Sequence, residues 1–229
     1  MRVLALDTAT EACSVALQSG EEVIGRFAEV GRSHAQQILG MVDDVLTEAR
    51  LSLSMLDGLA ACVGPGSFTG VRISVAVAQG LAFGADLRVV PVTTLEALAW
   101  QAMQRGARQV LACLDARMSE VYWGCFAADP VRGLIALGPG QVGPPESVSP
   151  STGGDYQGIG RGFSAYPQLA SLPGVNLMSE DARALPNARE IAWLGTLRLA
   201  LNEAIDPADL RPLYLRDKVA LTEAERSAK

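Results

Sequence analysis

The sequence contains one histidine, His34, and only two lysines, Lys218 and Lys229. Its four cysteines are widely spaced and form no C-x-x-C pair. A conventional zinc site needs about four converging Cys, His or carboxylate ligands, so this scarcity argues against a metal centre made by this chain alone. Each cysteine lies in an apolar, strand-like stretch, and we expect buried thiols in a reducing compartment.

The chain also lacks an excess of positive charge. Its 19 basic and 25 acidic side chains give a net charge of −6, with an isoelectric point near 4.9. Binding to nucleic acid depends mainly on neutralising phosphates, so this composition argues against unaided binding. Arg211, Arg216 and Lys218 form a modest basic cluster, for which a solvated face is the default interpretation.

No export or membrane segment is predicted. The first residues run directly into a strand-like stretch, without the layout of a signal peptide. The apolar run over 73–85 is shorter than a bilayer span and contains Gln79 and Gly80. We therefore expect a cytoplasmic protein that does not contact a membrane.

Hydrophobic residues make up 49% of the chain, which is enough for a sizeable core. Their spacing predicts the order β-β-β-α-β-α-β in the first part of the chain. Ser33 with Gln36, and Thr93 with Glu96, each predict a capping box at a helix start. The expected strands are 2–7, 12–18, 22–30, 59–63 and 88–92, and the expected helices are 34–49, 70–85 and 94–104.

The second part of the chain repeats the start of the first. Strands are expected over 109–115 and 120–127, and the first of them ends in Asp115 as the opening strand ends in Asp7. This echo predicts two related halves. Irregular strands and loops are expected over 130–162, and Asn187 is expected to open a last long helix that ends near Ala204.

A glycine-rich loop, Gly64-Pro65-Gly66-Ser67-Phe68-Thr69-Gly70, joins a buried strand to a strongly apolar helix. Glycine permits a tight turn, and Ser67 or Thr69 can cap the helix. The free N–H groups at such a helix start can hold an anion, but the glycines can equally serve close packing of strand on helix. The apolar helix must be buried, either in its own core or against another chain.

These motifs, in this order and spacing, resemble the TsaB (YeaZ) family of the bacterial tRNA threonylcarbamoyladenosine system. The likeness runs from Met1 to about Asp217, and the glycine loop is its most specific part. The motifs that carry it are Asp7-Thr8-Ala9-Thr10, Ser33-His34-Ala35, Gly64 to Arg72, Asp115-Ala116-Arg117-Met118 and Tyr214-Leu215-Arg216.

The resemblance implies an α/β fold with two actin-like (ASKHA, ribonuclease H-like) lobes, each built on a β-β-β-α-β-α core. It suggests an N-terminal lobe over 1–98, completed by the C-terminal helix. A smaller second lobe is expected over 99–217, followed by a frayed tail over 218–229.

The resemblance also implies a non-catalytic scaffold that pairs with and activates TsaD, together with the ATPase TsaE. That system transfers a threonylcarbamoyl group to N6 of the adenosine beside the anticodon. The chain is expected to form a homodimer when alone, and to meet tRNA only through the complex. It would need no cofactor of its own, because ATP, Mg²⁺ and the metal belong to the partners. Thr94 and Leu98 stand where TsaD carries its metal-binding histidines.

Two sets of candidate residues follow from this resemblance. The partner face is predicted to comprise Leu39, Val42, Asp43, Leu46, Arg72, Val75, Ala76 and Gln79, with Val42→Glu or Ala76→Arg leaving the chain folded. A vestigial or weak nucleotide or anion loop is predicted at Asp7, Thr8, Gly64, Gly66, Ser67, Thr69 and Asp115.

Two catalytic alternatives stay open. The first is an ATP-dependent phosphotransferase or ATPase of the same fold. The weaker one is a glycoprotease-like metallopeptidase, for which the sequence offers neither a nucleophile-elbow pattern nor a second histidine.

Overall fold

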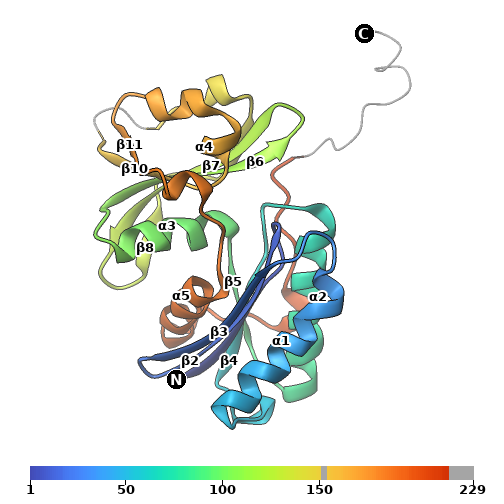
Figure 1. Cartoon of the computed structure of the whole chain (residues 1–229). Helices are drawn as coiled ribbons and strands as arrows, with labels where there is room; N and C mark the ends of the chain where they lie inside the picture. Colours follow the sequence, from blue (N-terminus) through green and yellow to red (C-terminus); the bar gives the residue numbers. More distant parts are fainter. Residues whose placement is uncertain (151–153, 217–229) are drawn as a thin grey trace.

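The structure is a computed structural model that describes residues 1–150 and 154–216. It has two lobes, each built on a β-sheet with helices packed against it (Figure 1). The elements of the first lobe are β1 (Arg2–Asp7), β2 (Ala12–Ser19), β3 (Glu22–Glu29), α1 (His34–Ala49), η1 (Leu53–Met55), β4 (Gly58–Cys62), α2 (Phe68–Ala85) and β5 (Val89–Val92). This order agrees with the predicted one.

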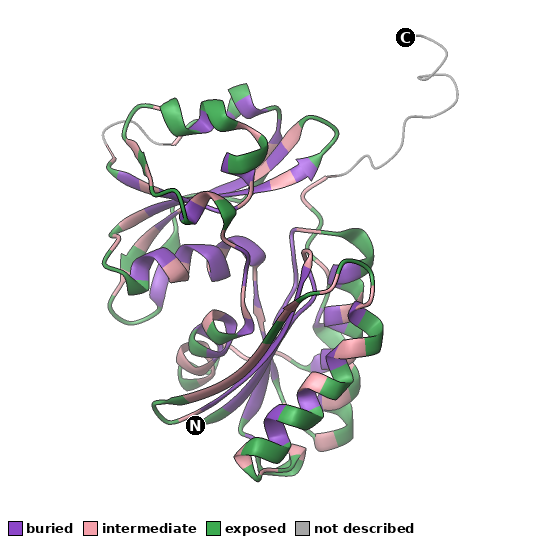
Figure 2. Ribbon diagram, in the orientation of Figure 1, coloured by how far each residue is buried: buried purple, intermediate pink, exposed green. Residues whose placement is uncertain are grey.

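The first sheet has the order β3-β2-β1-β4-β5, with β1 antiparallel to β2 and parallel to β4. Helices α1 and α2 cover one face, and α5 (Ala188–Ala200) covers the other (Figure 1). Because both faces are covered, the central strands are apolar along most of their length rather than alternating. Strands β1 and β4 are buried at every position except Arg2 (Figure 2).

The second lobe repeats the topology of the first. Its sheet has the order β11-β10-β6-β7-β8, with β9 also paired to β7. Strand β6 takes the place of β1, since it lies antiparallel to β7 and parallel to β10, and the predicted echo is thereby confirmed. The elements are α3 (Thr94–Gln104), β6 (Gln109–Arg117), β7 (Glu120–Asp129), β8 (Gly133–Ala136), β9 (Gln141–Gly143), η2 (Pro145–Ser147), β10 (Tyr156–Ile159), α4 (Gly162–Ala165), η3 (Pro167–Ser171), β11 (Val175–Leu177) and η4 (Asp181–Arg183), with η5 (Pro207–Asp209) following α5.

The two lobes exchange their last helices. Helix α3 follows β5 but packs on the second sheet, whereas α5 follows β11 and packs back on the first (Figure 1). The lobes therefore divide just before Thr94, and all of α3 belongs to the second lobe, instead of being cut at residue 98. One continuous core, which includes Val3, Leu98 and Ile191, runs between the two helices and both sheets.

The helix caps test three sequence predictions. Thr93 and Glu96 form the predicted capping box, with Glu96 N–H donating to Thr93 Oγ1 at 3.1 Å and Thr93 N–H donating to Glu96 Oε2 at 2.7 Å. Asn187 caps α5 as predicted, although the helix ends at Ala200 and not near Ala204. The capping box at Ser33 was a wrong prediction: Ser33 Oγ donates to the carbonyl of Val30 at 3.0 Å and makes no cap bond.

Helix α2 is covered by its own lobe on one side only. Its inner face, including Val71, Val75 and Ala78, packs on the sheet, while Ala76 and Phe83 are exposed (Figure 2). By length and composition alone, α2 is the one helix of the described residues that could cross a membrane. In this structure the first sheet covers only one face of α2, so apolar residues on its other face remain exposed.

Two glycines in helices provide a matched test of core packing. A Cβ at Gly195 in α5 would lie 2.5 Å from Cβ of Ala60, whereas one at Gly80 in α2 would meet nothing within 4 Å. We expect Gly195→Ala to lower the free energy of unfolding by ~1–3 kcal/mol through overpacking. Gly80→Ala should raise it by ~1 kcal/mol, because alanine favours the helix. Urea unfolding measures both, and stabilisation by Gly195→Ala would contradict this packing.

Candidate functional site

A cleft of about 790 Å³ opens between the lobes. Its walls are the loop after β1, the glycine loop at the start of α2, the end of β6 and the extended segment 213–216. Of the predicted loop residues, Gly66, Ser67, Thr69 and Asp115 line this cleft. The other three, Asp7, Thr8 and Gly64, are buried and do not line it.

The glycine loop packs directly on the loop after β1. Ser67 N–H donates to the carbonyl of Ala9 at 2.7 Å, and Thr8 Oγ1 donates to the carbonyl of Gly70 at 2.7 Å. A Cβ at Gly66 would overlap the carbonyl of Ala9, and one at Gly70 would overlap that of Thr8. The two backbones approach so closely that both positions must be glycine. The Ser67 N–H, which could have bound an anion, already donates to a carbonyl within the chain.

Asp7 lies beneath this contact and has no exposed surface. Its Oδ1 accepts from Ala9 N–H at 2.9 Å, while its Oδ2 is buried with no hydrogen-bond partner among the described residues. Burial raises the pKa of the Asp7 carboxyl, against the opposing influence of the Ala9 N–H, the Cys62 thiol and His34. His34 is itself buried, and its Nε2 lies 2.8 Å from the carbonyl of Thr10.

Asp115 lies across the cleft at the end of β6. Its Oδ1 accepts from Arg117 N–H at 2.8 Å, and its other oxygen lies 3.0 Å from the Arg117 guanidinium. Both strand-end aspartates therefore accept from the backbone N–H two residues on. They differ in burial, because Asp115 remains partly accessible at the cleft wall.

Two arginines join the lobes across the cleft: Arg161, which the sequence analysis did not single out, and Arg117, which it named only within a motif of the family resemblance. Arg161 lies 2.9 Å from Glu29 and 3.7 Å from Glu11, and Arg117 lies 3.6 Å from Glu11. These pairs join residues that are 100 or more positions apart in the chain. No local pattern marks them, so sequence reasoning had no signal by which to find them.

The segment 213–216 crosses the cleft as a strap. Leu213 N–H donates to the carbonyl of Val63 in the first lobe, and Arg72 Nε donates to Tyr214 Oη at 2.8 Å. At the other end, Arg216 pairs with Glu120 of the second lobe and donates to a backbone carbonyl of β6 at 3.1 Å. Arg216, predicted as part of a solvated basic cluster, is thus largely committed to bonds within the chain.

The predicted basic cluster is only partly described. Arg211 donates to backbone carbonyls of its own segment, including that of Leu210 at 2.9 Å. Lys218 lies outside the described residues.

The predicted partner face divides into two groups. Leu39, Asp43, Arg72 and Ala76 are exposed on the outer sides of α1 and α2, as Figure 2 shows for these helices. Val42, Leu46 and Val75 are buried in the core against the first sheet, and Gln79 bonds to the carbonyls of Pro207 and Leu210. The expectation that Val42→Glu leaves the chain folded is corrected, because a carboxylate there would enter the core.

The Asp7→Asn variant tests whether the negative charge of the buried carboxyl stabilises the fold. Since its pKa is raised in the folded state, Asp7 binds its proton more tightly there than in the unfolded chain, so stability falls as the pH rises above the unfolded value. The amide does not ionise, so we expect Asp7→Asn to be more stable than the parent at pH 8, with a smaller gain at pH 4.5. Urea unfolding at both values measures this, with exposed Asp44→Asn as the control. If the Asp7→Asn variant were less stable than the parent at pH 8, the charged carboxylate would be shown to stabilise the fold.

Comparison with known proteins identifies the family. The model of the family "TsaD: tRNA N6-adenosine threonylcarbamoyltransferase" matches residues 28–224. The Escherichia coli protein named "tRNA threonylcarbamoyladenosine biosynthesis protein TsaB" is 40% identical over 224 residues, which cover 96% of each chain. The Haemophilus influenzae protein of the same name is 38% identical, over 96% of this chain and 95% of that one.

A solved structure supports the same assignment. The Pseudomonas aeruginosa structure titled "YeaZ" has a TM-score of 0.86 and 39% identity, and covers 93% of this chain and 99% of that one. The two-lobed α/β fold of this chain agrees with the predicted actin-like architecture. The chain therefore belongs to the TsaB (YeaZ) family.

Proposed function

We propose that this chain is a non-catalytic subunit in the formation of N6-threonylcarbamoyladenosine in tRNA, and that it acts by pairing with a TsaD-family protein. Two relatives that match over nearly the full length are named for this biosynthesis, and the family model carries the name of the transferase. In this proposal a TsaE-type ATPase joins the pair, the chain dimerises when alone, and tRNA is met through the complex in the cytoplasm. ATP, Mg²⁺ and the metal are bound by the partner proteins.

The outer surface of α1 and α2 is the observation that carries the proposal. Leu39 is 55% exposed and Phe83 is 60% exposed. Between such residues the surface is recessed, because it is formed by glycines that carry no side chain. These are Gly40, Gly80 and Gly84, each of which has nothing within 4 Å of the position of a Cβ. Apolar side chains beside small residues allow another pair of helices to approach closely, as in a four-helix contact.

The interior of the chain supports a non-catalytic role. Thr94 and Leu98, which stand where the resemblance puts the histidines of TsaD, have no exposed surface. Across residues 1–150 and 154–216, no group of three or more His, Cys, Asp or Glu side chains could hold a metal. The single histidine faces a backbone carbonyl rather than a nucleophile, which leaves a peptidase mechanism without a base.

The phosphotransferase alternative is disfavoured by the contact between the two loops. In an ATP-binding member of this fold, phosphates and Mg²⁺ need room beside the strand-end carboxylate. Here the glycine loop lies over Asp7, and the carbonyl of Ala9 occupies the Ser67 N–H. The purified chain is therefore expected to hydrolyse no ATP above a protein-free blank with Mg²⁺ present. ATP turnover by the parent chain that is lost in an Asp115→Asn variant would support the phosphotransferase alternative.

Pairing is tested by charges placed on the exposed helix face. Leu39→Glu or Ala76→Arg should weaken binding to the TsaD-family protein of the same organism by at least ~2 kcal/mol, about thirtyfold, because each variant buries a charge without a partner. Co-purification and analytical ultracentrifugation measure the change.

The matched control for Leu39→Glu is Val131→Glu, which places the same negative charge on an exposed apolar residue of the second lobe. Circular dichroism should show all three variants folded. Undiminished pairing in both Leu39→Glu and Ala76→Arg would show that the partner binds elsewhere.

A further inference from the structure

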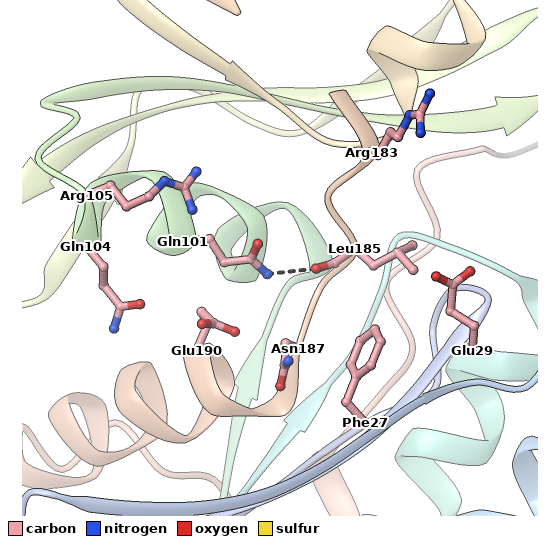
Figure 3. Close-up of a pocket in the computed structure, with 9 residues that line it drawn as sticks. All are labelled: Phe27, Glu29, Gln101, Gln104, Arg105, Arg183, Leu185, Asn187 and Glu190. Carbon is pink, nitrogen blue, oxygen red and sulfur yellow. Dashed lines mark hydrogen bonds between the residues drawn. The ribbon is translucent and has the colours of Figure 1, made fainter. Parts of the chain in front are cut away.

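A second cavity, of about 370 Å³, lies between the lobes and shares no lining residue with the cleft. We call it the Glu190 cavity. Figure 3 shows that its walls come from β3, α3, the segment before α5, and the first turn of α5. Its lining residues are Phe27, Glu29, Gln101, Gln104, Arg105, Arg183, Leu185, Asn187 and Glu190.

Glu190 is the distinctive group of this cavity. It is the third residue of α5, where a glutamate ordinarily turns back to cap its own helix, as Glu96 does in α3. Here Asn187 caps the helix, and Oε2 of Glu190 is buried with no hydrogen-bond partner among the described residues. A buried carboxylate oxygen without a donor is costly, and such a group calls for an explanation.

The other charges around the cavity are compensated or directed elsewhere. Glu29 is paired with Arg161 at 2.9 Å, and Arg105 is paired with the buried Asp181. Arg183 points away from the centre of the cavity in Figure 3. Glu190 is therefore the acidic lining residue that makes no ion pair within 4.0 Å among the described residues, although the charges of Arg105 and Arg189 act on its carboxyl.

The neutral groups of the cavity suit a cation. Gln101 Nε2 donates to the carbonyl of Leu185 at 2.7 Å, which leaves its Oε1 to accept from a ligand (Figure 3). Phe27 lines the cavity with its ring half exposed, and an aromatic face attracts ammonium and guanidinium groups. We propose that the Glu190 cavity binds a small organic cation, an alkylammonium or alkylguanidinium whose N–H groups donate to the Glu190 carboxylate.

This site predicts a characteristic pH dependence. Burial raises the pKa of Glu190 to about 7, against the opposing influence of its own backbone N–H, the charges of Arg189 and Arg105, and the side-chain amide of Gln101. Glu29, Asp181 and Arg183 are the other charged groups on the elements packed around it. Only the ionised carboxylate attracts a cation, so binding should tighten about tenfold as the pH rises from 6 to 8.

The proposal is tested by titrating the full chain with n-butylammonium chloride and, separately, with methylguanidinium chloride. Two-dimensional NMR follows the side-chain amides of Gln101 and Gln104, with sodium chloride at equal ionic strength as the reference. We expect saturable shifts at pH 8 that weaken about tenfold at pH 6. Glu190→Gln should weaken binding at least tenfold and remove its pH dependence, and Phe27→Leu should weaken it several-fold.

Glu21→Gln is the matched control, since it makes the same change in charge on an exposed hairpin turn and should bind as the parent does. Equal shifts with sodium chloride, or equal affinity in Glu190→Gln, would overturn the proposal. An absence of saturable binding to either cation at pH 8 would also overturn the proposal. It would indicate that Oε2 of Glu190 is hydrogen-bonded to water instead.

Discussion

The contact between two backbone loops, the one after β1 and the one before α2, is the constraint on which the first lobe depends. It requires glycine at two positions, because the carbonyls of Thr8 and Ala9 lie where a Cβ at Gly70 or Gly66 would be. Once the loops touch, the start of α2 is fixed relative to β1. The direction of the helix, and with it the face that α2 turns to solvent, follows from that contact.

The same contact has a chemical consequence. Asp7, at the end of β1, is covered by the packed loops, and its burial raises the pKa of its carboxyl. The cleft remains, about 790 Å³ in volume, but it is bridged by ion pairs of Arg161 and Arg117 and crossed by a strap that ends at Arg216. These features favour a structural role for the cleft, and the proposed pairing rests instead on the outer face of α1 and α2.

The exchange of helices between the lobes explains why both sheets share one core. Helix α3 and helix α5 lie against each other, each on the sheet of the other half of the chain. The Glu190 cavity lies beside this crossing, so the first turn of α5 faces the second lobe as well as its own sheet. At that turn Glu190 does not cap its helix, and one oxygen of its carboxylate, Oε2, is buried without a hydrogen-bond partner among the described residues.

The sequence alone determined the order of strands and helices in the first lobe, the repeat of Asp7 at Asp115 and the family, because hydrophobic periodicity, capping residues and motif spacing are local properties. The strands β8 to β11 of the second lobe were not individually predicted. The sequence also identified α1 and α2. The sequence of an apolar helix, however, does not show which of its sides will pack on its own sheet. The tertiary structure decided that Val42, Leu46 and Val75 face the core while Leu39 and Ala76 face solvent. It likewise decided the Ser33 cap, the interlobe ion pairs and the Glu190 cavity, since each depends on residues that only folding brings together.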